Sequence, residues 1–301
     1  MTTPSVIEHI TRPQDMSQSQ RLFHGRGHAF EGLEHVCVDW IAPAILITLF
    51  KEPEIEWLDQ LVSGLNEMFP EQESIQVQYR CRKGAPFEVK SGRELTELVA
   101  VEDGLKYHIA LGKAQNTGLF LDMLNGRRWL REQSAGKKVL NLFSYTCGFS
   151  VAAIEGGADL VVNVDMSKAS LATGRDNHRL NNHALDRVVF QGVDIFKSWG
   201  RIKKPGPYDI LVSDPPSFQK GSVNIQRDYH KIIRRIPELV VAGGLVMLCL
   251  NSPDLDDEFL LSQVAEHCPE CSLLQKIENP DIFKDAQAGK GLKVYVFKFG
   301  E

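Results

Sequence analysis

The sequence predicts an α/β fold in which a doubly wound, mostly parallel sheet follows a small α+β domain. Three observations support this prediction. After about residue 119, five apolar runs rich in β-branched residues alternate with helical segments, which is the pattern of buried parallel strands joined by crossover helices. Before that point, short strands and one amphipathic helix occur without such alternation. Hydrophobic residues at 43% and charged residues at 24% are ordinary for a folded globular chain.

The small domain is predicted over residues 20–112. The preceding residues 1–19 are polar and show no apolar period, so they are predicted to form a mobile tail. The domain is expected to contain strands at 35–40 and 44–50, a helix at 55–69, a strand at 75–81 and one or two strands within 94–111. Apolar residues recur at helical spacing in the predicted helix, which ends before Pro70.

The larger domain is predicted over residues 113–301. Its expected strands are 138–143, 159–165, 187–194, 208–214 and 244–250, and its expected helices are 148–156, 167–181 and 225–241. The near-continuous apolar character of these strands indicates a sheet that helices cover on both faces. The C-terminal stretch adds IENP (277–280) and LKVYVFKF (292–299), which are predicted to form a final antiparallel pair.

Charge and cysteine content exclude several classes of protein. The net charge of -5 does not suit a strongly basic nucleic-acid binder, so a nucleic-acid partner would need local basic clusters. The six cysteines are irregularly spaced, as expected for reduced thiols. Cys268 and Cys271 form a lone C-x-x-C pair with no second pair of ligands, so no metal site is predicted. No membrane-spanning run or secretory leader is visible, so a cytoplasmic protein is expected.

Polar side chains stand at four successive strand ends of the predicted sheet. Asn141, Asp165, Asp194 and Asp214 each lie at or near the end of an apolar run. Because ligands of doubly wound sheets bind beyond the carboxyl ends of the strands, these residues mark the expected binding site. Asp165 stands where a carboxylate can bind both hydroxyls of a ribose. One such aspartate alone would indicate a helix N-cap, whereas four in the same register favour a ligand.

The turn after the first of these strands bears on which nucleotide binds. It contains Gly148 but lacks the G-x-G-x-x-G fingerprint of dinucleotide sites. A dinucleotide is therefore the second candidate ligand. S-adenosylmethionine has a ribose but no pyrophosphate, and its cationic sulfonium tolerates acidic strand ends, so it is the favoured ligand.

The segment DPPSF (214–218) is the sharpest local signal. Pro215 and Pro216 fix an extended turn that lacks N–H donors, which leaves carbonyl groups free to accept hydrogen bonds from a planar amino group. Phe218 could then stack on the plane of a base. The alternative interpretation is a rigid loop without a ligand.

In these residues the chain resembles the class I S-adenosylmethionine-dependent methyltransferases, specifically the bacterial 23S ribosomal RNA large-subunit base methyltransferases. The resemblance rests on NTGLFLDMLNGRRWL (116–130), VLNLFSYTCGFSVAAIEGGA (139–158), VNVDMS (162–167), VDIF (193–196) and DPPSF. Residues 21–40 resemble the small β-rich domain that precedes the catalytic domain in that family. The resemblance implies a Rossmann-like seven-stranded methyltransferase sheet with S-adenosylmethionine as its cofactor. At the position of Cys147, members of that family usually have a second glycine.

The resemblance also implies roles for individual residues. Phe120 and Asp122 would help enclose the cofactor; Ser144, Tyr145 and Gly148 would line its methionine part; Asp165 would hold the ribose and Asp194 the adenine amino group. Asn141, Met166, Ile195 and Asp214 complete the expected cofactor-binding set. The target base would be positioned beside the methyl group by Asp214, Pro215, Pro216, Phe218 and Asn251.

Residues near the fifth strand bear on the target atom. Methylation of cytosine C5 needs a thiolate that adds to C6, and relatives of that type have Ser-Cys-Ser after this strand. Here the stretch is LCLNSPD (248–254), which puts Asn251 at the nucleophile position and leaves Cys249 as an expected core thiol. Nitrogen already has a lone pair, so positioning, with Asp214 as proton acceptor, can suffice. A ring or exocyclic nitrogen of guanine is therefore favoured over cytosine C5.

Three basic clusters are candidates for contacts with RNA phosphates. They are Arg127, Arg128 and Arg131; Lys220, Arg227, His230, Lys231, Arg234 and Arg235; and, on the small domain, Arg80, Arg82 and Lys83. An ordinary solvated helix face is the alternative interpretation for each side chain. No PUA or THUMP domain of the family is visible, so such clusters would have to supply the grip on RNA.

The sequence thus predicts a cytoplasmic enzyme that transfers a methyl group from S-adenosylmethionine to a base of ribosomal RNA. Two alternatives stay open. One is a methyltransferase that acts on a small molecule or a protein, and the other is a cofactor-binding RNA module without turnover. The oligomeric state does not follow from the sequence.

Overall fold

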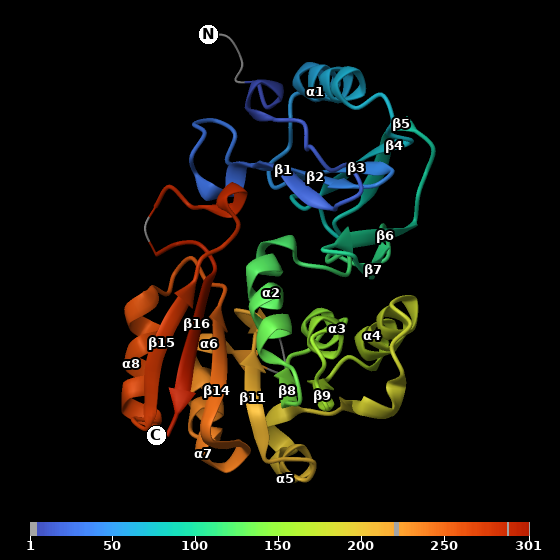
Figure 1. Cartoon of the computed structure of the whole chain (residues 1–301). Helices are drawn as coiled ribbons and strands as arrows, with labels where there is room; N and C mark the ends of the chain where they lie inside the picture. Colours follow the sequence, from blue (N-terminus) through green and yellow to red (C-terminus); the bar gives the residue numbers. More distant parts are fainter. Residues whose placement is uncertain (1–4, 220–222, 288, 301) are drawn as a thin grey trace. The chain divides into compact units, whose positions relative to one another are not determined.

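The computed structural model describes residues 5–219, 223–287 and 289–300. It divides the chain into two compact units, Met1–Leu121 with Asp281–Gln287, and Asp122–Pro280 with Ala288–Glu301 (Figure 1). The expected boundary at 112/113 lies inside the first unit, because the Ala110 N–H donates to the Thr117 carbonyl at 2.8 Å. The returning segment 281–287 is tied to the first unit by the Ala286 N–H, which donates to the Gly27 carbonyl at 2.7 Å.

The first unit contains a five-stranded sheet in the order β1-β2-β3-β4-β5 and a separate β6–β7 hairpin. Its elements are η1 (Ile7–His9), β1 (Gln20–His24), η2 (Gly25–Gly27), β2 (Val36–Ile41), β3 (Ala44–Leu49), α1 (Ile55–Met68), β4 (Ser74–Tyr79), β5 (Phe87–Gly92), β6 (Glu97–Glu102), β7 (Leu105–Ala110) and η6 (Asp281–Phe283). Strands β2 and β3 pair antiparallel, whereas β3 and β4 are parallel and are joined by α1. The apolar face of α1 is buried in the core of this unit.

The N-terminal segment does not form the mobile tail that its polar composition predicted, as far as its described residues go. Val6 and Ile10 are 2% and 7% exposed and belong to the core of the first unit. The backbone carbonyl of Met16 accepts a hydrogen bond from the Trp40 indole N–H at 2.8 Å. The prediction is wrong for this stretch because two apolar side chains flanking a short 3-10 turn show no period, yet both pack once the sheet is in place.

The second unit is built on a seven-stranded sheet in the order β10-β9-β8-β11-β14-β16-β15. Its strands are β8 (Lys138–Leu142), β9 (Leu160–Asp165), β10 (Val188–Gly192), β11 (Tyr208–Ser213), β14 (Val240–Leu250), β15 (Cys271–Ile277) and β16 (Lys293–Phe299), with a short hairpin β12 (Phe218–Gln219) and β13 (Val223–Asn224). Its helices are η3 (Leu121–Met123, at the boundary), α2 (Leu124–Gln133), α3 (Gly148–Glu155), α4 (Lys168–Leu180), η4 (Leu185–Arg187), η5 (Ile195–Lys197), α5 (Trp199–Lys203), α6 (Ile225–Ile233), α7 (Ile236–Leu239) and α8 (Asp257–His267). The predicted fold class, an α/β sheet preceded by a small α+β unit, is confirmed.

Two predicted elements differ from the structure. The helix expected over 225–241 is broken into α6 and α7, because Pro237 lacks an N–H to continue the ladder and instead starts a new short helix. The strand that pairs with β16 is β15, which ends at Ile277 rather than covering 277–280. This edge strand was not predicted because its side chains are largely exposed and include the polar residues Ser272, Gln275 and Lys276, so it lacks an apolar pattern.

Both faces of the sheet are buried, which explains the near-continuous apolar strands. On one face, side chains of β8, β11 and β14 form a core with α6, α7 and α8. On the other face, the alternate side chains of the same strands form a core with α2 and α3. In Figure 1, α2 and α3 lie on one side of the sheet.

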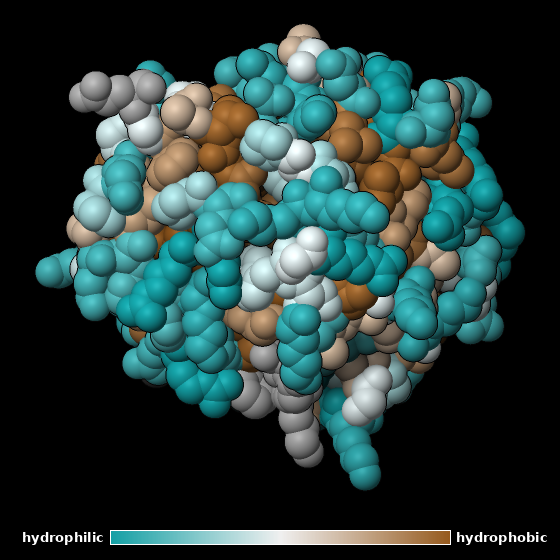
Figure 2. Space-filling view, turned by 90° about the horizontal axis from the view of Figure 1, so that it is seen from below, coloured by the Kyte–Doolittle hydropathy of each residue, from teal (hydrophilic) through white to brown (hydrophobic). Residues whose placement is uncertain are grey.

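Within the described residues, no helix combines the length and the apolar character that crossing a membrane requires. On the face drawn in Figure 2, hydrophilic side chains predominate and hydrophobic ones lie between them. Such a mixed surface is usual for a folded domain.

Packing of the N-terminal segment can be measured through Ile10. We expect Ile10→Ala to lower the free energy of unfolding by about 2 kcal/mol, because it removes a buried aliphatic side chain. The matched control is Ile55→Ala in α1, where the isoleucine is 77% exposed and the change should stay within about 0.5 kcal/mol. Urea unfolding followed by tryptophan fluorescence compares the two variants. Equal effects would contradict the packing described here.

Candidate functional site

The strand order of the larger sheet reverses between β8 and β11. From β8 the chain proceeds to β9 and β10 on one side, and from β11 it proceeds to β14 on the other. Leu142 and Ser213, the last residues of the two strands, are paired in register. A crevice at such a reversal is where doubly wound sheets bind ligands. The site is therefore expected among the residues that follow β8 and β11 and their neighbours β9, β10 and β14.

The loop after β8 has an unusual backbone. Phe143, Tyr145 and Cys147 have φ values of 56°, 47° and 63°, in the left-handed region that non-glycine residues rarely adopt. Clusters of such residues are found at functional sites. The thiol of Cys147 is buried, and burial raises its pKa. A Cβ at Gly174 of α4 would lie 2.3 Å from its Sγ, so this helix can approach only through a glycine. Cys147 thus takes the tight turn that a second glycine was expected to provide.

Asp165, at the end of β9, holds this loop. Its Oδ2 accepts a hydrogen bond from the Tyr145 N–H at 2.9 Å, and its Oδ1 accepts one from the Ser167 N–H at 2.7 Å. Burial raises the pKa of Asp165, and the two backbone donors oppose that rise. Each carboxylate oxygen has a further lone pair for a hydroxyl donor. This arrangement fits the predicted contact with a ribose.

Asp194, at the end of β10, is a helix cap. Its Oδ1 accepts a hydrogen bond from the Phe196 N–H at 2.9 Å, and its Oδ2 lies 3.1 Å from the ammonium of Lys197. The alternative interpretation of an acidic strand end, an N-cap, therefore applies here. Contact between Asp194 and an adenine amino group stays a prediction. Of the neighbouring candidates, Ile195 is buried in the core and Met166 is exposed.

Asn141, in β8, begins a buried polar chain that sequence analysis missed. Its Nδ2 donates to Asn163 Oδ1, Asn163 Nδ2 donates to Ser150 Oγ, and Ser150 Oγ is hydrogen-bonded to His178 Nε2, each at 2.9 Å. Burial lowers the pKa of His178 to about 3, so the ring is neutral. An asparagine in the middle of the apolar run 160–165 was the available signal.

This chain leaves one acceptor without a protein partner. Asn141 Oδ1 is buried and has no hydrogen-bond partner among the described residues. A buried unpartnered acceptor is costly unless a ligand or water completes it. Together with Asp165 it provides acceptors and negative charge at the crevice, which suit a nucleoside that has hydroxyl donors and a positive charge.

Asp214, directly after β11, lies in a cluster of charged groups. Burial and the nearby Asp122 carboxylate raise its pKa to about 7, against the opposing effect of Arg127. Arg127 is only 4% exposed, so its prediction as a surface contact for RNA is wrong. Because α2 packs its Arg127 face on the sheet, this guanidinium instead moderates the acidic charge of the site.

The double-proline loop and the end of β14 lie together. Ser217 Oγ donates a hydrogen bond to the Asn251 carbonyl. Tyr229 of α6 donates its hydroxyl to the Cys249 carbonyl at 2.8 Å, and the Ser213 carbonyl lies 3.4 Å from the same hydroxyl. Pro215 is buried, whereas Pro216 and the Asn251 side chain are exposed. The structure thus brings Ser217, which follows the double-proline turn, next to Asn251, and their role in positioning a base stays a prediction.

Other predicted site residues are placed as follows. Ser144 is buried, and Tyr145 and Gly148 are half-buried in the loop after β8. Phe120 is exposed and belongs to the first unit. The backbone of Phe218 starts β12, but its side chain lies outside what the structure describes, as does all of Lys220.

Cys249 is a core thiol, as predicted. It is fully buried in the core between the sheet and α2 and α3. Burial, Asp214 and Asp122 together raise its pKa well above that of a free thiol. A raised pKa favours the protonated thiol at neutral pH.

The basic side chains of α6 and of the turn that follows it are partly compensated by two carboxylates. Arg227 and Lys231 form ion pairs with the buried Asp228 at 2.9 and 2.8 Å, and Arg235 pairs with Glu238 at 2.7 Å. Arg234 Nη2 lies 3.3 Å from His267 Nδ1. In α2, Arg128 is exposed and donates to Asn125 Oδ1 at 3.3 Å. Their expected role as contacts for RNA stays a prediction.

Cys268 and Cys271 lie near each other without further ligands. Their sulfur atoms are 3.5 Å apart. Across the described parts of the chain, no three His, Cys, Asp or Glu side chains come together as metal ligands would. The pair lies at the junction of α8 and β15 and contributes to packing there.

Comparison with known proteins gives the family of this chain. Residues 20–298 match the family model described as S-adenosylmethionine-dependent methyltransferase. Ribosomal RNA large subunit methyltransferase K of Neisseria meningitidis serogroup B is 34% identical over 224 residues, and methyltransferase I of Photobacterium profundum is 30% identical over 246 residues. These alignments cover 69% and 78% of this chain, and 62% of each relative, so the chain spans less than two thirds of their length.

A solved structure agrees with this result. SMU.776, solved in complex with SAH, superposes with a TM-score of 0.84 at 26% identity, over 94% of this chain and 76% of that one. SAH, S-adenosylhomocysteine, is what S-adenosylmethionine becomes once it has lost its methyl group. The family model, the relatives and the strand-end acids agree. The chain belongs to the S-adenosylmethionine-dependent methyltransferases.

Proposed function

We propose that this chain methylates a ring or exocyclic nitrogen of a guanine base in 23S ribosomal RNA. The names of the two relatives support ribosomal RNA as the acceptor. Two features together support the choice of atom. The pKa of Asp214 is raised, and the thiol of Cys249 is buried with a raised pKa that favours its protonated form. A site with a proton acceptor but no thiolate suits a nitrogen nucleophile.

The residues at the strand ends fit the cofactor. Asp165 offers free lone pairs to the ribose hydroxyls, and Asn141 Oδ1 is an unpartnered acceptor for a cationic donor group. Asp122, Asp165 and Asp214 supply negative charge that complements the sulfonium. When bound, S-adenosylmethionine supplies a methyl group activated by its attachment to positively charged sulfur.

The residues around Asp214 fit an acceptor base. Pro215 and Pro216 remove N–H donors from this stretch, so its carbonyl groups can accept hydrogen bonds from a base amino group. Asn251, held beside the loop by Ser217, adds an exposed amide. With a pKa of about 7, Asp214 is half ionised near neutral pH and can take a proton from a reacting amino nitrogen.

One observation favours a second candidate function. Among the basic side chains that would flank an RNA acceptor, Arg227 and Lys231 of α6 share the carboxylate of Asp228, and Arg235 after α6 is paired with Glu238. Partial compensation of this positive charge weakens attraction to phosphates, which favours a small-molecule or protein acceptor over RNA.

The acceptor can be identified by transfer of a tritiated methyl group. The substrates are total RNA from a strain that lacks the gene, a protein extract and a pool of small metabolites. We expect label in RNA and, after digestion to nucleosides, in an N-methylated guanosine. Label in 5-methylcytidine would refute the nitrogen target. Label in protein or metabolites alone would establish the second candidate, and no transfer would leave a cofactor-binding module.

The role of Asp214 predicts a pH dependence. The carboxylate accepts a proton only when ionised, so the rate at saturating substrate should fall as pH drops below about 7 and level off above it. Asp214→Asn should lower kcat roughly 100-fold or more and abolish that dependence. Calorimetric titration with S-adenosylhomocysteine checks that the variant still binds the product. A variant with normal kcat and an unchanged pH profile would contradict the role.

The nitrogen target also predicts that Cys249 is dispensable. We expect Cys249→Ala to keep kcat within about twofold of the unmodified protein, because a protonated core thiol takes no part in the reaction. Cys268→Ala is the matched control, since Cys268 is equally buried on the other core. Complete loss of activity in Cys249→Ala alone, with cofactor binding retained, would instead support a thiolate mechanism.

A further inference from the structure

Two arginines of the first unit converge on one aromatic ring. The guanidinium carbon of Arg26 lies 4.5 Å from the centroid of the Phe50 ring, and that of Arg80 lies 5.5 Å from the same centroid. Arg26 is exposed and Arg80 is half-buried. Stacking on a ring stabilises a guanidinium without neutralising its charge.

Among the described residues, neither guanidinium has an anionic partner. In the part of the chain that the structure describes, no carboxylate oxygen lies within 4.0 Å of Arg26 or Arg80. Arg80 Nε has a neutral partner, the Gln115 amide oxygen, at 3.2 Å once that amide is oriented to face it. Burial and the charge of Arg26 lower the pKa of Arg80. An anion between the two side chains would relieve this repulsion.

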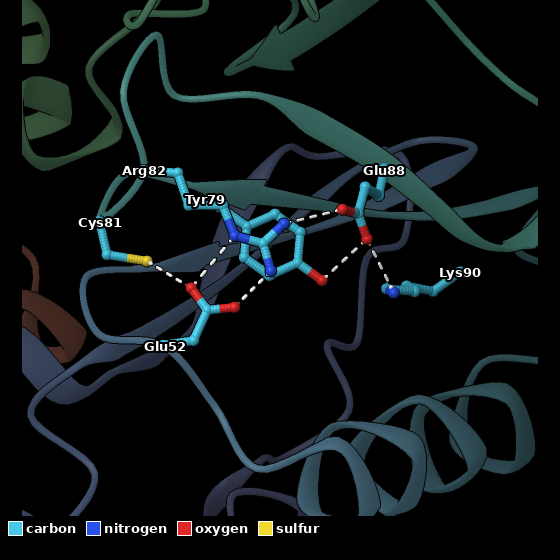
Figure 3. A network of polar contacts seen from close by, with 6 residues as sticks. All are labelled: Glu52, Tyr79, Cys81, Arg82, Glu88 and Lys90. Atoms are coloured by element: carbon cyan, nitrogen blue, oxygen red, sulfur yellow. Dashed lines mark hydrogen bonds and ion pairs between the residues drawn. The ribbon is translucent and has the colours of Figure 1, made fainter.

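Arg82, only two residues from Arg80, is different. Its guanidinium donates to Glu88 Oε1 at 2.8 Å and to Glu52 Oε2 at 3.1 Å, and Glu88 is also paired with Lys90 at 2.9 Å (Figure 3). Arg93 is likewise paired with Glu73. The sequence cluster Arg80, Arg82 and Lys83 is thus not one patch, because Arg82 is neutralised within the unit.

In the turn that contains Arg26, the residues on both sides of the arginine must be glycine. Arg26 lies between Gly25 and Gly27 in η2. A Cβ at Gly25 would lie 1.8 Å from the Leu33 carbonyl oxygen, and one at Gly27 would lie 2.5 Å from the Lys284 carbonyl oxygen. The neighbouring backbone therefore requires glycine on both sides, and it fixes the position from which Arg26 projects. Such preorganisation lowers the entropy cost of binding.

We propose that Arg26 and Arg80, supported by Phe50, form a binding site for a backbone phosphate of RNA. This proposal rests on the proposed function, in which RNA is the methyl acceptor. It assigns part of the RNA binding to the first unit. Two guanidinium groups offer planar, charged donors that match phosphate oxygens. The first hundred residues hold nine basic and fifteen acidic side chains. Two arginines without a carboxylate partner among the described residues are therefore unusual in this acidic segment.

Binding of a fluorescent single-stranded RNA fragment tests the site directly. We expect Arg26→Ala and Arg80→Gln each to weaken binding roughly three- to tenfold and to lower the slope of log affinity against log salt by about 0.7. Arg93→Ala is the control, because it removes the same charge from an exposed ion pair and should leave the slope unchanged. Thermal melts verify folding, and Arg26→Lys should recover part of the affinity.

The outcomes separate this proposal from the proposed function. If all variants, Arg93→Ala included, lose affinity equally, or if none does, the phosphate site is refuted while RNA methylation can still be observed. If the unmodified protein neither binds nor methylates RNA, the proposed function itself fails. Binding of polyglutamate is measured alongside binding of RNA. If Arg26→Ala weakens polyglutamate binding more than RNA binding, the site recognises acidic peptides and the proposal is overturned.

Discussion

Strands β8 and β11 pair in parallel while the chain leaves them toward opposite edges of the sheet, and the chemistry of the larger unit depends on this divergence. In doubly wound sheets, such a reversal of strand order opens a crevice beyond the carboxyl ends of the strands. The loops after β8 and β11 therefore face the same crevice. The register that pairs Leu142 with Ser213 brings the Tyr145 loop and Asp214 to the same edge, although about seventy residues separate them.

The carboxylates at this edge are held in two different ways. Asp165 is fixed by two backbone donors, which suits a group that must bind in one orientation. Asp214 has a carboxylate neighbour and a buried arginine, and its pKa is raised to about 7. Neighbouring acids whose environments differ in this way can take different roles, one in binding and one in proton transfer.

The arginines of the first unit also differ in their surroundings. Most of its arginines are paired with a glutamate or aspartate, as Arg82 is in Figure 3. Exposed pairs of this kind contribute little to stability, but they decide which positive charges remain available. Arg26 and Arg80 remain available because, among the described residues, no carboxylate oxygen lies within 4.0 Å of either guanidinium.

The sequence by itself determined the fold class and the set of strand-end acids, because apolar runs and the residues that end them are local patterns. The sequence also indicated that Asn251, and not Cys249, occupies the position of the cysteine nucleophile in relatives that methylate cytosine. It could not place Val6 and Ile10 in a core, show that Arg127 is buried, or connect Asn163 and Ser150 to His178. Those facts depend on contacts between residues far apart in the chain, which exist only after the sheet has formed. The difference between Arg80 and Arg82 has the same cause, since a charge is neutralised by whichever carboxylate the tertiary structure brings near it.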